Sequence, residues 1–395
     1  MIGWVLLLEK IINNSKKMNS KQVNEVKIIA IYLPQFHAIP ENNKWWGDGF
    51  TEWTSTKKAQ PLFKGHYQPK EPLNKNYYNL LELKTREWQA GLAEKYGVYG
   101  FCYYHYWFNG KKLLEKPAEE VLRIKKPDLP FCFSWANESW SRTWYSLKKE
   151  TLLEQKYGGE KEWGDHFKYL LSFFKDERYI KVDNKPVFLI YKPSKIPEFD
   201  QMIIFWRKLA IKEGFEGIHI TETLTKTQKK PISEFSEAVM YYEPGFTLQY
   251  SNYFTRLKTS LKIKLSKILE DKNYKIKFLS KKLLNKLNYN SFYRSIINRK
   301  LKKIRQNQYL GSFVNFDDTA RRGSRAYIFN NVTPNKFEQN MVCMIKKAQN
   351  IGSEFLFVTA WNEWAEGAYL EPDNKTGYAF LEAIKKAKIK CGYKL

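Results

Sequence analysis

The sequence of 395 residues lacks several features that would assign it to a common class of protein. No apolar run is long enough to cross a bilayer, and the short apolar run after Met1 has neither a basic segment before it nor a small-residue cleavage site. We find no phosphate-binding loop and no serine in a nucleophile elbow. These absences argue against a membrane span, a secretory signal, an NTPase and a serine esterase.

Cysteine and histidine are also scarce. None of the four cysteines forms a CxxC pair or a zinc spacing, which favours reduced thiols in a reducing compartment. No set of His, Asp and Glu has the spacing of metal ligands, so we expect neither a metal nor a cofactor. We therefore expect a cytoplasmic protein. Residues 1–26 should form a poorly ordered lead before one domain at 27–395.

Positive charge, by contrast, is abundant and unevenly distributed. The formal net charge is +26, and residues 251–310 contain 17 Lys and Arg but only 2 acidic residues. Loosely helical spacing of apolar residues indicates a basic helical insertion in this range. The segment is either a solvated lysine-rich excursion or a patch that contacts an anionic membrane face or a phosphorylated lipid. We expect no nucleic-acid partner, because no RNP, KH or zinc-knuckle pattern occurs.

Apolar strand-like runs alternate with helical segments along the rest of the chain. The eight runs are 27–36, 97–107, 130–140, 186–192, 217–222, 238–244, 311–318 and 354–360. The helices between them are expected at 79–96, 159–175, 198–213 and 335–350. This alternation predicts a parallel sheet, and eight units predict a closed (β/α)8 TIM-type barrel with the basic insertion between strands 6 and 7. An open doubly wound sheet is the alternative, but no glycine-rich dinucleotide turn follows the first run.

The most informative stretch follows the last expected strand. Trp361, Asn362, Glu363, Trp364 and Glu366 lie within six positions. Indoles stack on sugar faces, amides bind hydroxyls, and paired carboxylates perform acid–base chemistry on glycosidic bonds. We therefore predict that Glu363 and Glu366 are catalytic and that the other three bind substrate. The alternative places both tryptophans in the core and both glutamates in water.

Similar residues follow other expected strands, where a barrel enzyme has its site. The further substrate-binding candidates are Trp46, Glu52, Trp53, His105, Trp135, Asn137, Glu138, Asp317 and Arg321. Asp317 and Arg321 could instead serve a sugar-nucleotide transferase, which would use acids for a divalent ion and arginines for phosphate.

Four motifs together resemble those of the WbsX-like proteins. They are Ala30–His37, Trp46–Trp53, Trp135–Glu138 and Trp361–Gly367, and Tyr369–Asp373 also fits. That family is associated with O-antigen and other surface-polysaccharide gene clusters and is labelled glycosyltransferase. Its domain resembles the (β/α)8 barrel of glycoside hydrolase family 99. The resemblance covers residues 27–385 apart from the basic insertion.

The resemblance also implies roles for the two glutamates. In the hydrolase relatives, one glutamate of the Asn-Glu-Trp-x-Glu-Gly motif assists the sugar 2-hydroxyl as it attacks the anomeric carbon, and the other protonates the leaving oxygen. By that resemblance Glu363 takes the first role and Glu366 the second. The leading interpretation is an enzyme that cleaves or transfers a glycosidic bond in surface-polysaccharide (O-antigen, lipopolysaccharide or capsule) synthesis, located in the cytoplasm or peripherally at the inner membrane face. A sugar-nucleotide glycosyltransferase and a noncatalytic glycan-binding barrel are the alternatives.

Overall fold

The computed structural model describes residues 25–141, 150–248 and 284–394. Most of the expected N-terminal lead and residues 251–283 of the expected basic insertion lie outside these residues. The predictions that concern them therefore stay predictions.

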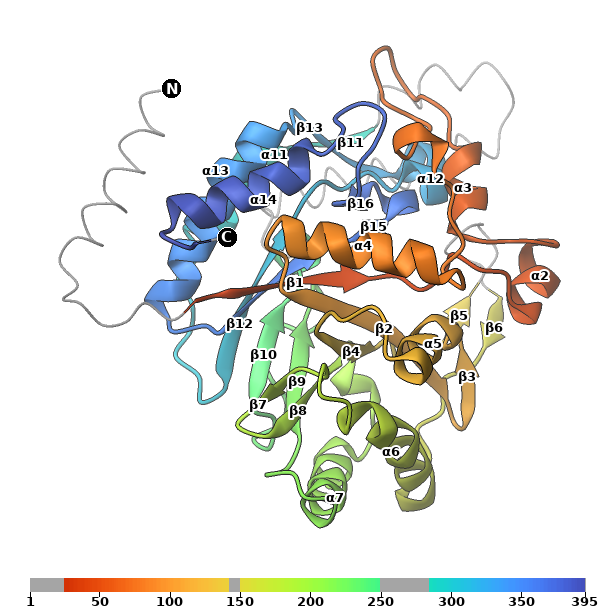
Figure 1. Ribbon diagram of the computed structural model, residues 1–395, viewed down its shortest axis with the longest axis vertical. Coiled ribbons are helices and arrows are strands. Elements are labelled where there is room, and N and C mark those ends of the chain that lie inside the picture. The colour runs from red at the N-terminus through yellow and green to blue at the C-terminus, as the bar shows by residue number, and fades with distance from the viewer. Residues whose placement is uncertain (1–24, 142–149, 249–283, 395) are drawn as a thin grey trace.

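Eight parallel strands form a closed barrel, as the sequence predicted (Figure 1). They are β1 (Lys27–Tyr32), β2 (Gly100–Phe108), β4 (Phe131–Trp135), β8 (Lys185–Ile190), β9 (His219–Leu224), β10 (Ala238–Tyr241), β12 (Asn307–Phe313) and β14 (Phe355–Thr359). The barrel closes because β1 pairs with β2 on one side and with β14 on the other.

The strands form where apolar and β-branched residues run without interruption. In β14, all five residues from Phe355 to Thr359 are buried, as expected for a strand with the barrel interior on one face and helices on the other. Gly311 of β12 is required by close packing, because a Cβ atom there would collide with the backbone carbonyl oxygen of Tyr241 in β10.

Helices surround the strands (Figure 1). The longer ones are α4 (Leu83–Lys95), α5 (Lys116–Ile124), α6 (Glu160–Phe174), α7 (Phe199–Lys212), α11 (Tyr289–Ile297), α13 (Pro334–Asn350) and α14 (Ala379–Lys390). The shorter ones are α2 (Pro40–Trp46), α3 (Glu52–Lys58), α8 (Gly245–Leu248) and α12 (Thr319–Arg322). Helix α13 begins where Pro334 occupies the first turn and the Thr333 side chain accepts a hydrogen bond from the Lys336 N–H.

Short strands and turns complete the fold outside the barrel. The strands are β3 (Lys111–Leu113), β5 (Trp140–Ser141), β6 (Thr151–Leu153), β7 (Lys181–Val182), β11 (Asn285–Asn288), β13 (Tyr327–Asn330), β15 (Asn362–Glu363) and β16 (Ala368–Tyr369). The 3-10 turns are η1 (Leu73–Lys75), η3 (Pro193–Lys195), η5 (Gly323–Arg325) and η6 (Trp364–Glu366). Strands β15 and β16 form a hairpin after β14, and the site is built around it.

Residues 284–310, the described part of the range 251–310, pack into the fold and are not a solvated insertion. Strand β11 pairs with β13, and α11 buries Tyr289 and Tyr293. The Tyr289 hydroxyl donates to the Val314 carbonyl oxygen, and the Tyr293 hydroxyl donates to that of Phe313. Strand β12 already begins at Asn307, four residues before the expected start. Residues 284–310 therefore belong to the barrel and its helical layer, because buried tyrosines anchor them.

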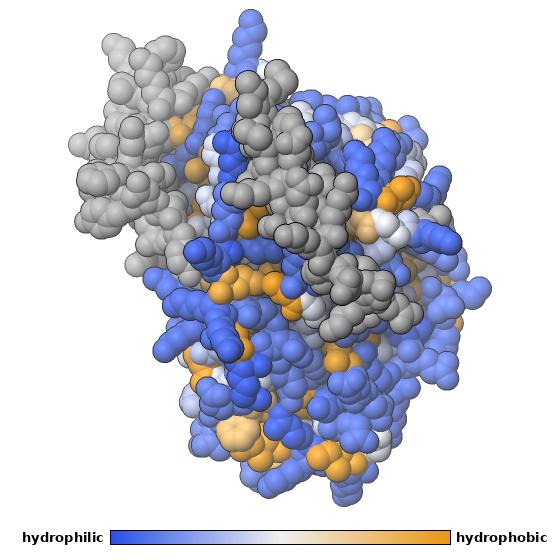
Figure 2. Space-filling view, turned by 90° about the vertical axis from the view of Figure 1, so that its left-hand side faces the viewer, coloured by the Kyte–Doolittle hydropathy of each residue, from blue (hydrophilic) through white to orange (hydrophobic). Residues whose placement is uncertain are grey.

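The visible surface in Figure 2 is mainly hydrophilic, with apolar residues in small separate groups. Among the described residues, no helix has the length and apolar character that a membrane span requires.

Candidate active site

A pocket of about 290 Å³ opens at the carboxyl ends of the barrel strands. Its acidic lining residues are Glu138, Asp318, Glu363 and Glu366, and its basic ones are Lys192, Lys226, Arg321 and Arg322. Its tyrosines are Tyr104, Tyr106, Tyr191, Tyr242 and Tyr327. This is the end of the barrel at which the sequence placed the site.

The two glutamates predicted to be catalytic both line this pocket, and both come from the hairpin after β14. Glu363 ends β15, and Glu366 ends the turn η6. Gly367 follows with a φ angle of 59°, which reverses the chain into β16. Its missing side chain also matters, because a Cβ atom would lie 3.0 Å from the Cβ atom of Asp317. The tight turn thus presents both carboxyls to one cavity.

The two carboxyls have different surroundings. Glu363 is 3% exposed, and its Oε1 atom has no hydrogen-bond partner among the described residues. Burial, together with the neighbouring Glu366 carboxylate, raises the pKa of Glu363 well above its ordinary value. Glu366 is more exposed and its Oε1 accepts a 2.6 Å bond from Arg321 Nη1. The pocket therefore combines a buried carboxyl with a raised pKa, Glu363, and a carboxylate whose charge Arg321 offsets, Glu366.

Arg321 connects Glu366 to the first loop of the barrel. Its Nη2 atom donates to Glu52 Oε1 at 2.9 Å, and the same oxygen accepts the Ala365 N–H at 3.0 Å. Glu52, in the first turn of α3, is fully buried and does not line the pocket. It therefore holds in place both the Arg321 guanidinium and the turn that carries Glu363 and Glu366.

Tyrosines form a wall of the same pocket. Tyr104 of β2 and Tyr242 after β10 have hydroxyl oxygens 2.8 Å apart. Burial and the Glu363 carboxylate raise the pKa of both hydroxyls far above the ordinary value. Tyr191, which follows β8, also has a raised pKa through burial and the charge of Glu138. The wall consists of neutral hydroxyls that can bond to sugar hydroxyls.

Two further charged residues, Asp318 and Lys192, line the pocket. Asp318 Oδ2 accepts a 2.8 Å bond from Arg322 Nε, and burial raises the pKa of Asp318 to about 7 despite that arginine. Lys192 Nζ donates to Thr227 Oγ1 at 2.8 Å. Glu138, predicted to bind substrate, lines the pocket near Lys192, and its charge opposes the lowering of the Lys192 pKa by burial.

Trp361 and Trp364 do not line the pocket. Both are essentially fully buried, and their indole N–H groups donate to the two carboxyl oxygens of Glu371, at 3.0 and 2.6 Å. Tyr78 and Gln89 donate to the same carboxyl at 2.8 and 2.6 Å. Burial raises the pKa of Glu371 to about 7, and these four donors oppose the rise. The tryptophans therefore form the floor beneath the catalytic turn.

Asn362 is also structural in position. Its Oδ1 accepts the Leu33 N–H at 2.8 Å, and its Nδ2 donates to the Leu33 carbonyl oxygen at 3.0 Å. These two bonds join the hairpin to the residue that follows β1. The Asn362 side chain thus acts here as a neighbouring strand would, although Asn362 lies beyond the end of β14.

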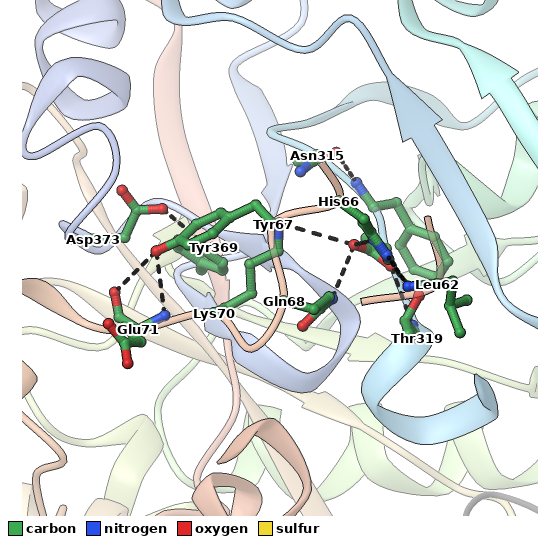
Figure 3. A network of polar contacts seen from close by, with 12 residues as sticks. Leu62, His66, Tyr67, Gln68, Lys70, Glu71, Asn315, Thr319, Tyr369 and Asp373 are labelled. Atoms are coloured by element: carbon green, nitrogen blue, oxygen red, sulfur yellow. Dashed lines mark hydrogen bonds and ion pairs between the residues drawn. The ribbon is translucent and has the colours of Figure 1, made fainter. Parts of the chain in front are cut away.

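Asp317 binds the loop at 62–70 through His66 and Gln68, which are labelled in Figure 3. It is 2% exposed, and its Oδ2 lies 2.8 Å from His66 Nε2 and accepts a 2.9 Å bond from Gln68 Nε2. His66 Nδ1 accepts the Leu62 N–H, so Nε2 is the donor to Asp317. Oδ1 accepts from the Thr319 hydroxyl. Both oxygens are occupied, and Asp317 does not line the pocket.

His105 in β2 and Trp135 in β4 contact His166 of helix α6, and Asn137 follows β4. His105 Nε2 is 2.8 Å from His166 Nε2 of α6, and burial lowers the pKa of His105 to about 3. Trp135 is fully buried and donates to the Trp107 carbonyl oxygen. The Asn137 amide bonds to both the N–H and the carbonyl oxygen of Lys192. These three side chains stabilise the walls and do not line the pocket.

The aromatic residues of the first loop also lie away from the lining. Trp53 is buried, donates to the Tyr78 carbonyl oxygen and packs 5.3 Å from Trp364, between ring centroids. Trp46 ends α2 and packs against Phe50. Of the fourteen residues predicted for the site, the pocket thus contains Glu138, Arg321, Glu363 and Glu366.

Sequence reasoning missed the tyrosine wall and the Glu371 anchor. Tyr104, Tyr191 and Tyr242 lie within or directly after apolar strands, where a tyrosine resembles an ordinary core aromatic. Their common signal is position, because each one lies at the carboxyl end of a barrel strand. Glu371 follows an apolar tyrosine–leucine pair, and only the fold shows that four donors converge on it.

Comparisons with known proteins agree with this architecture. The family model Glycosyltransferase WbsX matches residues 28–384. The protein WxcX of Xanthomonas campestris pv. campestris is 31% identical over 363 residues, which cover 91% of this chain and 49% of that protein. The chain thus spans about half the length of the curated relatives it matches.

Solved structures share the fold at low sequence identity. A GH99 endo-α-mannosidase from Bacteroides thetaiotaomicron aligns with a TM-score of 0.53 and 11% identity, covering 92% of this chain and 96% of that one. A glycoside hydrolase-like protein aligns with a TM-score of 0.55 and 13% identity, covering 94% and 96%. The chain belongs to the WbsX glycosyltransferase family, and it has the (β/α)8 barrel also found in GH99 endo-α-mannosidases.

Proposed function

We propose that this chain is an enzyme that cleaves or transfers a glycosidic bond, with Glu363 and Glu366 as its acid–base pair. The observation that supports the proposal is the meeting of both carboxyls in one pocket at the carboxyl end of the barrel. Unequal environments suit such a pair, because one group must hold a proton while the other accepts one. The reaction belongs to bacterial surface-polysaccharide synthesis, of the O-antigen, lipopolysaccharide or capsule type.

The roles follow the resemblance to the hydrolases. Glu363 accepts the proton of the sugar 2-hydroxyl as that oxygen attacks the anomeric carbon, and Glu366 donates a proton to the leaving oxygen. In the free protein the raised pKa favours the protonated form of Glu363, so these roles require that the proton of the pair lies on Glu366 when the substrate is bound. Once ionised, Glu363 is a stronger base than an ordinary carboxylate. The tyrosine hydroxyls of the pocket wall bind the sugar, and Glu138 contributes to binding from the rim.

A sugar-nucleotide glycosyltransferase is the second candidate. The observation that favours it is the group of four cations, Lys192, Lys226, Arg321 and Arg322, in the same pocket as the glutamates. Guanidinium and ammonium groups bind the diphosphate of an activated donor. We place either enzyme in the cytoplasm, with residues 251–310 contacting an anionic face of the inner membrane.

Two assays on wild-type protein separate these functions. Fluoride release from α-linked disaccharide fluorides, beginning with a mannose disaccharide, reports glycosidic-bond chemistry. Release of nucleoside diphosphate from a panel of sugar nucleotides reports the transferase. The control is the Glu363→Gln/Glu366→Gln double variant. If neither product forms while saturation-transfer NMR detects glycan binding, the chain is a noncatalytic glycan-binding barrel and the enzyme proposal is wrong.

A further inference from the structure

A second cavity, of about 350 Å³, lies beside the active-site pocket. It is lined by Leu224, Lys229, Lys230, Pro231, Tyr241, Phe246, Thr247, Ser295, Asn298, Arg299, Lys300, Leu301, Lys302 and Ile304. We call it the basic cavity. Leu224 ends β9 and Tyr241 ends β10, and the residues that follow them, Thr225 and Tyr242, line the active-site pocket. The two cavities therefore border the same two loops.

The rim of the basic cavity is strongly cationic. Lys229, Lys230, Lys300 and Lys302 are exposed, and no carboxylate of a described residue forms an ion pair with them. None of the described lining residues is acidic. Four unpaired ammonium groups around one opening favour an anion with more than one charged oxygen, such as a phosphate.

Arg299 stands between this rim and the floor. Its Nη2 atom donates to Glu243 Oε1 at 2.6 Å and to Thr247 Oγ1 at 2.8 Å, whereas the buried Nη1 atom has no hydrogen-bond partner among the described residues. The buried Glu243 offsets the charge of Arg299, so the four lysines supply the attraction. The guanidinium carbon lies 4.8 Å from the ring centroid of Phe246 and 5.5 Å from that of Tyr241.

The floor is largely apolar, and the uncharged polar side chains of the lining are Thr247, Ser295 and Asn298, beside the hydroxyl of Tyr241. Leu224, Leu301 and Ile304 contribute aliphatic surface. Arg299 already covers the two aromatic rings, which leaves them poorly placed to stack a base. No described lining residue offers a carboxylate for ribose hydroxyls. Ile232, 46% exposed in the loop that carries Lys229 and Lys230, extends the apolar surface beside the rim.

We propose that the basic cavity binds a long-chain alkyl or prenyl phosphate. The lysines bind the phosphate, and the hydrocarbon chain covers the aliphatic floor, where the apolar surfaces of both are removed from water. The site lies outside the active-site pocket, and its ligand is not the group on which Glu363 and Glu366 act. The proposal therefore does not depend on the glycosidic chemistry proposed above.

The direct test is titration calorimetry of the full chain with farnesyl phosphate below its micelle concentration. We expect saturable binding at one site. Farnesol, which lacks the charge, and inorganic phosphate, which lacks the chain, should each bind at least about tenfold more weakly. If inorganic phosphate binds with equal affinity, the hydrocarbon chain is not recognised and the proposal is wrong. If a nucleoside diphosphate binds with equal affinity, the cavity does not select an alkyl or prenyl phosphate, and the proposal is also wrong.

Matched variants locate the site. Lys229→Gln/Lys300→Gln/Lys302→Gln should weaken farnesyl phosphate binding by about tenfold or more. Lys161→Gln/Lys168→Gln/Lys208→Gln removes equal charge from exposed positions on α6 and α7 and should leave binding unchanged. An equal loss in both triple variants, or no loss in the first, overturns the site. If the first variant unfolds, Lys300→Gln alone must still weaken binding. Glu363→Gln should keep full affinity, which separates this result from the fate of the enzyme proposal.

Discussion

Glu366 Oε1 lies 2.6 Å from Arg321 Nη1, so the more exposed of the two pocket glutamates is bound to a cation in the free protein. Nη2 of the same guanidinium donates a hydrogen bond to the fully buried Glu52. A substrate therefore enters a site in which one of the two carboxylates is already paired with a cation. Five predictions test this arrangement and its consequences.

Glu363→Gln and Glu366→Gln should each lower turnover by roughly 10²–10⁴, because each removes a positioned acid or base while keeping the side-chain shape. Sugar affinity, followed by saturation-transfer NMR, should change little. Glu138→Gln is the matched control from the same pocket. It should lower turnover less than the other two substitutions do, and its main effect should be a weaker sugar affinity. Near wild-type turnover by both variants would falsify the assignment and direct attention to the sugar-nucleotide alternative.

A substrate with a good leaving group separates the two roles. A glycosyl fluoride leaves with little need for a proton, so Glu366→Gln should recover much of its lost rate on the fluoride when compared with the natural glycan. Glu363→Gln should not recover, because attack by the sugar 2-hydroxyl still needs a base. Initial rates on both substrates give the comparison, and recovery confined to Glu363→Gln would reverse the assignment.

The buried carboxyl of Glu363 should also be visible in stability. Its folded-state pKa is raised above the ordinary value of 4.5, so the folded protein binds more protons than the unfolded chain between those two values. The contribution of Glu363 to stability is thus present below about pH 4.5 and is lost as the pH rises toward the folded pKa.

Glu363→Gln removes that titration. The free energy of unfolding of the variant, minus that of wild type, should increase as the pH is raised from 4.5 and then level off. Urea denaturation across this range measures the difference, and Glu138→Gln provides the control. A difference that stays constant with pH shows that the Glu363 carboxyl is not buried as described.

Arg321→Met should destabilise the fold by about 3–5 kcal/mol, because it leaves the buried carboxylate of Glu52 without its cation. Adding Glu52→Gln should restore part of that loss, since the uncompensated charge is then gone. Arg123→Met, which breaks an exposed pair with Glu120, should leave the denaturation midpoint unchanged. If the double variant is no more stable than Arg321→Met, the two residues are not energetically coupled.

Glu371→Gln should destabilise the protein and slow turnover together. The glutamine amide nitrogen cannot accept, so at least one of the four donors loses its acceptor, at about 1–3 kcal/mol each. Denaturation midpoints and initial rates measured on the same samples test this. Glu87→Gln on the barrel-covering helix α4 is a control in which no change is expected. Full activity would show that the tryptophan floor does not position the catalytic turn.

The barrel could be predicted because each strand carries its own local signal. The runs at Lys27–Tyr32 and Phe355–Thr359 are apolar without interruption, and the alternation with helices leaves few topologies open. The convergence of Glu138, Glu363 and Glu366 followed from the same rule, since the ends of parallel strands meet at one edge. No such rule says which way a residue points once the strand has ended.

Trp361 and Trp364 illustrate that limit. Next to Glu363 and Glu366 they were interpreted as sugar-stacking residues, yet their indoles turn inward to Glu371, up to ten residues along the chain. The buried carboxylate of Glu371 decides the orientation of both indoles. Its other donors, Tyr78 and Gln89, come from the first quarter of the sequence. Hydrogen bonds between such distant segments have no local signature. The tryptophans nevertheless share the catalytic turn, which explains why a motif-based prediction grouped them.

The Asn362 bond to Leu33 joins residues that are 329 positions apart. On the ribosome, β1 therefore emerges long before its partner β14 exists, and its edge stays open while most of the chain is made. Glu363 and Glu366 follow β14, the strand that closes the barrel, and are therefore made directly after it. A nascent chain thus lacks this pocket until the segment that carries β14 and the hairpin has been made, and any activity of Glu363 and Glu366 requires a completed barrel.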